Sequence, residues 1–245
     1  KMYDRNGTLL YEIYASQNRT LVPLSSVPKY LADATIAIED KDFYNHKGID
    51  VAGIVRAARE TLVNKNLQGG STITQQLIKS AILTPEVSLS RKVKEVALAL
   101  WTERIYSKEE ILEMYFNQVS YGGTAYGVGA ASEVYFGKKV EDLTLAESTF
   151  LAGLPVAPSV YSPYSKTPTA WEGRQKEVLN QMVEIGYISQ EQAEEVANEE
   201  LSFRQPRTPI LAPHFVMYVR DFLIDRYGSD MVERGGLIVT TSLDL

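Results

Sequence analysis

Strand-like patterns occur only near the two ends of this chain, and the sequence between them shows the apolar spacing of helices almost throughout. At the amino end, residues 3–14 predict a β-hairpin around Asn6-Gly7, a pair that accepts the positive φ angles of a tight turn. At the carboxyl end, residues 237–243 predict a further strand, which we expect to pair with the hairpin. The pattern therefore predicts a mainly α protein with a small terminal β element.

Capping residues predict where the helices begin and end. Apolar spacing indicates a helix from Pro28 to Asp40, and Asp50 can cap another that runs to Leu62. Further starts are expected at Ser71 or Thr72, at Ser88 or Ser90, at the capping-box pairs Ser107/Glu110, Thr144/Glu147 and Ser189/Gln192, at Thr167-Pro168, and near residue 213. Ends are expected at Ile82, Tyr106, Gly186 and Gly228. The Pro- and Ser-rich stretch 155–168 is the expected linker between subregions.

The composition excludes several classes of site. The chain has no cysteine, so disulfides, thiol nucleophiles and Cys-ligated zinc are excluded, and its two histidines are His46 and His214. A formal net charge of -6 argues against a nucleic-acid binder. No apolar run reaches the roughly 18 residues that span a bilayer. Because the chain begins inside a strand pattern, we expect it to be a piece of a longer protein.

A carboxylate pair, Glu39-Asp40, ends an apolar helix and meets an aromatic-rich loop. A glutamate held against apolar neighbours such as Ile36 and Phe43 has the environment of a general acid or base. The alternative is a solvated helix end, with His46 as a packed or capping side chain.

Two further segments carry polar and basic residues at helical spacing. After Gly69-Gly70, the spacing places Gln75, Gln76 and Lys79 in one sector of a helix, and the alternative is a capped surface helix. At the start of the next helix, Arg91, Lys94 and Glu95 share one face. Cations are disfavoured at a helix amino terminus, so a phosphate or pyrophosphate ligand would explain them. A solvated face with an Arg91–Glu95 pair is the alternative.

The remaining candidate segments are dominated by packing. In 108–117 the apolar stripe of Ile111, Leu112 and Tyr115 leaves Asn117 outside it, free to face a site. The segment 174–179 is interpreted as an amphipathic helix with a structural role.

In this order, the segments resemble the motifs of the peptidoglycan glycosyltransferases (glycosyltransferase family 51), which form the amino-terminal domains of class A penicillin-binding proteins. The matches are E-D-x-x-F-x-x-H-x-G at 39–48, G-x-S-T-I-T-Q-Q at 69–76, R-K-x-x-E at 91–95 and K-x-x-I-L-x-x-Y-x-N at 108–117. The fifth motif departs from the pattern, with Gln175 where a second arginine is usual.

The resemblance implies a lysozyme-like helical lobe with a smaller, membrane-associated jaw at about 71–110. It implies an enzyme that polymerises lipid II into glycan strands by inverting transfer in bacterial cell-wall synthesis. Glu39 would be the base that takes the proton from the acceptor 4-hydroxyl, and Glu95 would assist near the pyrophosphate. Phosphates would be neutralised by Lys79, Arg91 and Lys94, and other substrate-binding residues would be Asp40, Ser71, Gln75, Gln76 and Asn117.

The same resemblance implies the surroundings of the reaction. It implies a divalent cation, Mg²⁺ or Mn²⁺, near Glu95, and no organic cofactor. The expected partners are lipid II, the growing lipid-linked glycan, the membrane and moenomycin-type inhibitors, without nucleic acid. The expected location is the outer, periplasmic side of the inner (cytoplasmic) membrane. Residues 1–235 would form the glycosyltransferase domain and 236–245 the start of a linker towards a transpeptidase domain.

Three hypotheses follow for testing. In the unusually apolar stretch 80–89, we expect Ile82, Leu83, Val87 and Leu89 to face lipid or the lipid tail of the substrate. A lysozyme-like hydrolase is the nearest rival function, because it too uses two carboxylates, but it needs no phosphate clamp. A non-catalytic helical module that docks on a partner or membrane is the other rival.

Overall fold

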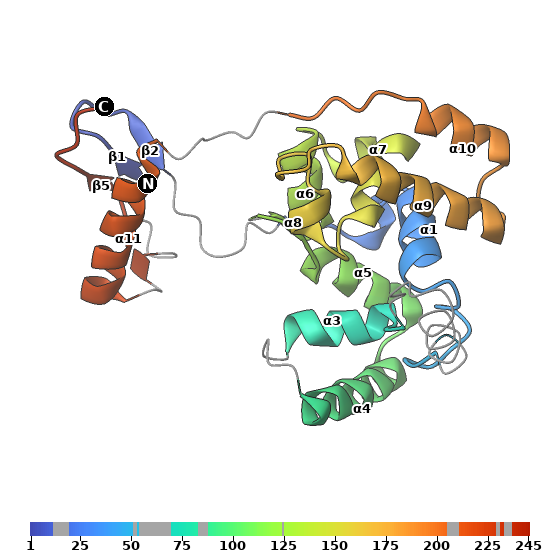
Figure 1. The fold of residues 1–245 in the computed structure, drawn as a ribbon. Helices are drawn as coiled ribbons and strands as arrows, with labels where there is room; N and C mark the ends of the chain where they lie inside the picture. Colours follow the sequence, from blue (N-terminus) through green and yellow to red (C-terminus); the bar gives the residue numbers. More distant parts are fainter. Residues whose placement is uncertain are drawn as a thin grey trace. The chain divides into compact units, whose positions relative to one another are not determined.

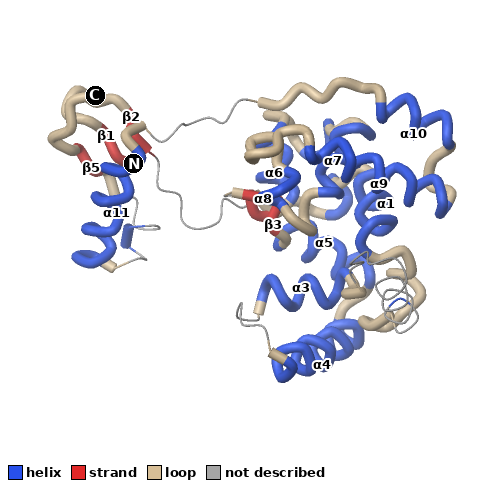
Figure 2. The backbone as a smooth tube through the Cα atoms, viewed as in Figure 1, coloured by secondary structure: helices blue, strands red, loops and turns tan. Residues whose placement is uncertain are grey.

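A computed structural model describes residues 1–11, 20–50, 53, 70–82, 88–123, 125–204, 211–228, 231–232 and 237–245. By their contacts the residues form two compact units, 1–18 with 204–245, and 19–203. The fold is mainly helical, as predicted (Figures 1 and 2). Apart from Gly53, which is helical, the helix expected over 51–62 lies outside the described residues, as do Gly69 and residues 83–87.

The first unit joins the two ends of the chain through a small sheet. Strand β1 (Met2–Tyr3) pairs antiparallel with β2 (Leu9–Tyr11) and parallel with β5 (Val239–Thr240), in the order β2-β1-β5. Asp4 accepts hydrogen bonds from the backbone N–H of Asn6 and Thr8, and Gly7 has φ 85°, so the predicted hairpin turn is confirmed. Helix α11 (Pro213–Tyr227) packs on this sheet through Val216 and Leu223, which are buried with Met2 and Leu10.

The second unit holds the remaining elements. They are η1 (Leu24–Ser26), α1 (Lys29–Glu39), α3 (Ile73–Ala81), α4 (Leu89–Ile105), α5 (Lys108–Gln118), β3 (Ser120–Gly122), β4 (Ala125–Tyr126), α6 (Val128–Tyr135), η2 (Val140–Asp142), α7 (Leu145–Gly153), α8 (Pro158–Tyr161), α9 (Ala170–Ile185) and α10 (Gln190–Ala197). The three predicted capping boxes are present at the starts of α5, α7 and α10. Hydrogen bonds between residues three apart therefore fix where these three helices begin.

Helices α1, α7 and α9 pack against one another through small side chains. Ala34 and Ala37 of α1 and Ala152 of α7 are buried with Val178 and Met182 of α9. Alanines at a helix contact allow the backbones to approach closely, so the end of α1 is held near α9. This packing decides what surrounds Glu39, the last residue of α1.

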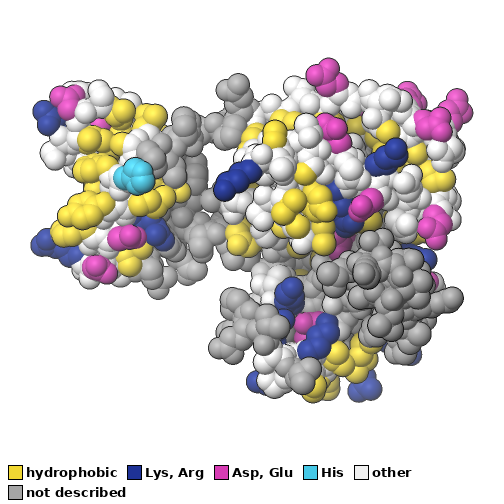
Figure 3. Space-filling view, in the orientation of Figure 1, with side chains coloured by type: hydrophobic (Ala, Val, Ile, Leu, Met, Phe, Trp, Pro, Cys, Tyr) yellow, Lys and Arg dark blue, Asp and Glu magenta, His cyan; other side chains and the backbone are white. Residues whose placement is uncertain are grey.

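Helices α3 and α4 lie side by side at one end of the second unit, with α5 packed against α3 (Figure 1). Basic and apolar side chains lie together on the face of this end shown in Figure 3. On α4, Val93 is 68% exposed and Trp101 is 60% exposed, and Leu100 and Ile105 are also exposed. No helix among the described residues has both the length and the apolarity needed to cross a membrane.

The structure differs from the sequence prediction in several elements, among them helix α6, which was not predicted. A second hairpin, β3–β4, was not predicted. Helix α9 begins at Ala170, later than the predicted Thr167-Pro168. The expected linker 155–168 lies inside the second unit, where it forms α8 and stacks Tyr164 on Tyr135, so its prolines mark packed turns instead of a boundary. The expected domain range 1–235 stays a prediction.

Candidate active site

Glu39 lies at the carboxyl end of α1 with its side chain 8% exposed. Its Oε2 accepts a hydrogen bond of 2.7 Å from Nε2 of Gln76 on α3. Its Oε1 is buried, has no hydrogen-bond partner among the described residues, and lies 3.9 Å from Nη2 of Arg174 on α9. Burial raises the pKa of Glu39, Asp40 also raises this pKa, and Gln76 and Arg174 lower it. A buried carboxylate with a raised pKa is suited to accept a proton.

Asp40 is occupied by the protein itself. Its carboxylate lies 2.9 Å from Nε2 of His46, and its Oδ2 accepts from the backbone N–H of Ile73 at the start of α3 over 2.9 Å. The N–H of Gly48 donates to Nδ1 of His46, so Nε2 carries the hydrogen that is donated to Asp40. Asp40 therefore ties the 39–48 segment to α3, and this geometry does not support the substrate contact predicted for it.

The two adjacent glutamines of α3 have different roles. Gln75 is fully buried, and its Oε1 accepts from the backbone N–H of Thr72 while Thr72 Oγ1 accepts from Gln75 N–H. This reciprocal pair is a capping box, so Oε1 of Gln75 stabilises the helix start. Its Nε2 is buried without a hydrogen-bond partner among the described residues, and the substrate contact that the family resemblance implies for Gln75 stays a prediction. Gln76, the next residue, turns to Glu39, and Lys79 is exposed in the last turn of α3.

On α4, Glu95 is buried and paired with Lys92, whose Nζ lies 2.5 Å from Glu95 Oε1. The same Nζ donates to Oγ of Ser71 over 3.0 Å, which joins α4 to the start of α3. The alternative Arg91–Glu95 pair does not form. The buried Nε of Arg91 has no acceptor among the described residues, and Lys94 is exposed. Arg91 thus has a donor available for an anion.

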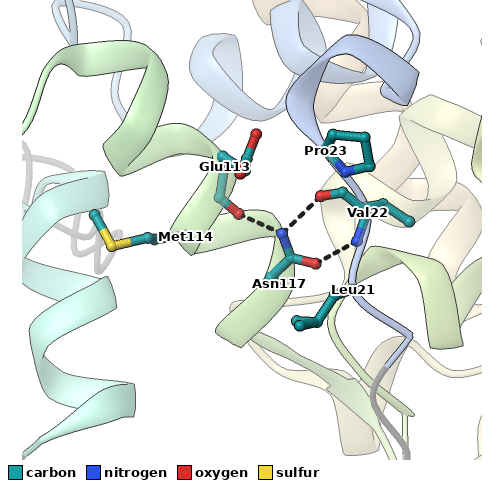
Figure 4. A pocket seen from close by; sticks show the side chains of 6 residues that line it. All are labelled: Leu21, Val22, Pro23, Glu113, Met114 and Asn117. Atoms are coloured by element: carbon teal, nitrogen blue, oxygen red, sulfur yellow. Dashed lines mark hydrogen bonds between the residues drawn. The ribbon is translucent and has the colours of Figure 1, made fainter.

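The side chain of Asn117 on α5 holds the segment 21–24 (Figure 4). Its Oδ1 accepts from Val22 N–H over 2.9 Å, and its Nδ2 donates to the carbonyl oxygens of Val22 and Glu113. Glu113 Oε2 also accepts from Leu24 N–H. Val22, Glu113 and Asn117 line a surface pocket of about 350 Å³ with Leu21, Pro23 and Met114. Asn117 therefore has an anchoring role that its sequence position did not reveal.

Sequence reasoning missed two groups at this site. Arg174 was assigned a structural role, yet its guanidinium faces Glu39. Gln175, its neighbour, is buried and donates to Ala146 O and Thr149 Oγ1, which agrees with a packing role. Lys92 was passed over for Arg91 and Lys94, although its spacing of three residues from Glu95 was a usable signal.

The described residues do not fit a metal ion held by the protein. They contain no group of three or more His, Asp or Glu side chains placed to bind a cation. Glu95, the expected ligand, is already paired with the ammonium of Lys92. We therefore derive no step through a metal.

Comparison with known proteins gives a consistent result. A sequence profile described as "Transglycosylase" matches residues 6–183. Penicillin-binding protein 1A of Rickettsia typhi is 43% identical to this chain; the match covers 100% of this chain and 32% of that protein. Penicillin-binding protein 1A of Escherichia coli K12 is 42% identical; the match covers 98% of this chain and 28% of that protein. The crystal structure of penicillin-binding protein 1A from Haemophilus influenzae superposes with a TM-score of 0.60 at 26% identity, over 99% of this chain and 26% of that one.

The chain thus spans about a third of the length of the curated relatives that it matches. The profile covers most of the chain, and it includes Glu39, Gln76, Glu95 and Arg174. The chain belongs to the transglycosylase family.

Proposed function

We propose that this chain polymerises lipid II into glycan strands by inverting glycosyl transfer. The observation that carries the proposal is the state of Glu39, a buried carboxylate with a raised pKa and one oxygen without a hydrogen-bond partner among the described residues. Membership of the transglycosylase family supports the same reaction class. The relatives named penicillin-binding protein 1A support a role in cell-wall synthesis.

In the proposed reaction, Glu39 takes the proton from the 4-hydroxyl of the acceptor sugar. The oxygen of that hydroxyl forms a bond to the anomeric carbon of the growing chain, and the bond from that carbon to the lipid pyrophosphate breaks with inversion. Arg91, Lys79 and Lys94 neutralise the departing pyrophosphate. The Nε of Arg91, which has no acceptor among the described residues, supports the proposal that Arg91 binds the pyrophosphate. Glu95 keeps Lys92 and Ser71 in place beside these cations.

The proposed substrate sets the surroundings. We place the protein at the outer face of the cytoplasmic membrane, with the α3–α4 end towards lipid, and expect moenomycin-type inhibitors to bind. The exposed Val93, Leu100, Trp101 and Ile105 of α4 support this orientation, as does Ile82, which is 62% exposed. Leu83 and Val87, which the sequence hypothesis also assigns to lipid, lie outside the described residues, as does the side chain of Leu89. Whether the reaction requires a divalent cation stays a prediction, tested by adding a chelator to the polymerisation assay.

A glycoside hydrolase is less well supported. Such an enzyme needs a second carboxyl group at the sugar, beside the first. Of the carboxylates that the sequence analysis singled out beside Glu39, Asp40 is bound to His46 and Ile73, and Glu95 is bound to Lys92, so each already has a partner in the protein. Incubation with lipid II separates the two functions, because a transferase yields polymer and a hydrolase instead digests preformed glycan.

Replacing Glu39 with glutamine tests the proposal most directly. We expect Glu39→Gln to lower the polymerisation rate by at least about 100-fold, because a general base usually contributes that much, while the protein stays folded. Glu147→Gln is a matched control, because Glu147 is also a buried carboxylate, with its side chain 9% exposed and paired with Lys138. Full polymerisation by Glu39→Gln would refute the assignment and favour a non-catalytic module.

A further inference from the structure

Arg174 is held at three points between α9, α7 and α1. Its Nη1 lies 2.8 Å from Glu177 Oε2, and its Nε donates to the carbonyl oxygen of Gly153 over 3.4 Å. Its Nη2 lies 3.9 Å from Glu39 Oε1. The side chain is only 14% exposed, so most of its charge acts inside the protein.

Helix α7 ends in Gly153, and this glycine leaves room for the aliphatic stem of Arg174, whose guanidinium lies near Glu39. A Cβ atom built at Gly153 would lie 2.9 Å from Cγ of Arg174, closer than two carbon atoms can pack. The absence of a side chain at Gly153 therefore leaves room for the arginine stem between α7 and α9.

Few other groups stabilise the negative charge of Glu39. Oε2 receives one hydrogen bond from the neutral amide of Gln76, and Oε1 receives none from the described residues. Asp40 disfavours the ionised form of Glu39. Tyr115 and Tyr121 are buried nearby, and burial together with the charge of Glu39 raises the pKa of each, so both remain neutral. Arg174 is the positive charge that acts on Glu39 among the described residues.

We propose that Arg174 is a positioning residue of the transfer reaction, whose guanidinium faces Oε1 of Glu39 and keeps this buried carboxylate ionised and oriented. The inference rests on the proposed function, because Arg174 acts through the proposed base. It assigns chemistry to the segment 174–179, which sequence analysis interpreted as packing alone.

The test measures the protonation of Glu39 apart from activity. The protein is labelled with ¹³C at the glutamate carboxyl carbons, and the Glu39 signal is assigned by its loss in Glu39→Gln. In Arg174→Gln, the midpoint of the Glu39 titration should rise by about one pH unit or more, as expected when an opposite charge within about 4–6 Å is removed. Arg174→Lys, which keeps the charge, should recover part of the shift. Lys176→Gln, which removes an exposed charge from the same helix, should leave the midpoint unchanged.

Polymerisation of lipid II is then measured against pH for the same variants. The acid limb of Arg174→Gln should move to higher pH in parallel with the titration midpoint, so that raising the pH restores much of the rate. Gly153→Ala, which displaces the arginine stem and keeps its charge, should move the limb in the same direction.

An unmoved Glu39 midpoint in Arg174→Gln, with a rate that falls equally at every pH, would overturn the inference and leave Arg174 a structural residue. If Arg174→Gln does not fold, an unmoved midpoint in Gly153→Ala, which displaces the arginine stem, would overturn it. A wild-type protein that makes no polymer would refute the proposed function instead, and the titration would still decide the role of Arg174.

Discussion

Nε2 of Gln76 donates a hydrogen bond to Oε2 of Glu39 over 2.7 Å and so joins the first turns of α3 to the last residue of α1. The position of α3 is itself fixed through Asp40, which accepts from Ile73 N–H at the start of that helix. Glu39 and Asp40, adjacent in sequence, therefore have different roles. One is available for proton transfer, and the other holds the helix that orients its neighbour.

Removing this hydrogen bond should weaken the proposed base. Hydrogen bonds to charged groups contribute about 1.5–3 kcal/mol, so Gln76→Ala should lower kcat/KM near neutral pH by about 10-fold or more. Because Gln76 lowers the pKa of Glu39, the acid limb should also move to higher pH. Gln118→Ala, which removes an amide bound to the Ser80 carbonyl, is the control in the same pH series. A profile like that of the wild type would contradict the prediction.

Asp40→Ala should reduce the free energy of unfolding. It leaves the N–H of Ile73 and Nε2 of His46 without their buried acceptor, which should cost about 2–3 kcal/mol. Asp33→Ala, which breaks the exposed pair with Lys29, should cost less than about 1 kcal/mol. Urea unfolding of both variants measures the difference. Equal losses would show that the Asp40 network contributes no more than a surface pair.

The stability of the protein should depend on pH through Glu39. Its pKa is raised in the folded state, so between the ordinary value of 4.5 and the folded pKa the folded protein holds a proton that the unfolded chain has released. Stability contributed by the protonated form is complete below 4.5 and is lost as pH rises through the folded pKa. Glu39→Gln should therefore gain stability over the wild type as pH increases across this window. Measuring the free energy of unfolding of both proteins at pH 4 and pH 8 checks the sign of this change. A stability difference that shrinks as pH rises would contradict the prediction.

Asn117→Ala should act on stability more than on catalysis. It removes three hydrogen bonds, two of which hold Val22 against α5, and should cost about 1–3 kcal/mol of unfolding free energy. Asn198→Ala, on the exposed end of α10, should be close to neutral. Thermal unfolding measures both. A large rise in KM with unchanged stability would instead restore the substrate contact predicted from the sequence.

The exposed apolar residues of α4 should bind lipid. Replacing Val93 and Trp101 with serine should reduce binding to anionic vesicles several-fold, because it removes apolar area from a helix that also carries Arg91, Lys92 and Lys94. Replacing Val156 and Val160, which are comparably exposed elsewhere in the same unit, should change binding little. Co-sedimentation compares the pairs. An equal effect of both would locate the membrane surface elsewhere.

The sequence by itself determined the helical class, most helix boundaries and the pairing of the two chain ends. A capping box is formed by residues three apart, so Ser107/Glu110 and Thr144/Glu147 are visible without any knowledge of packing. The sequence also identified Glu39 as a carboxylate in apolar surroundings.

Only the tertiary structure decided which polar groups meet. Gln75 and Gln76 are adjacent in sequence, but the way α3 packs against its neighbours gives them different partners. Gln75 caps the helix start, and Gln76 binds Glu39. Arg174 is far from Glu39 in sequence, and their approach depends on alanine contacts among α1, α7 and α9 and on the missing side chain of Gly153. The reason is physical. Helix caps form from hydrogen bonds within one turn, whereas a buried charge is compensated by whichever group the packing of distant helices brings beside it.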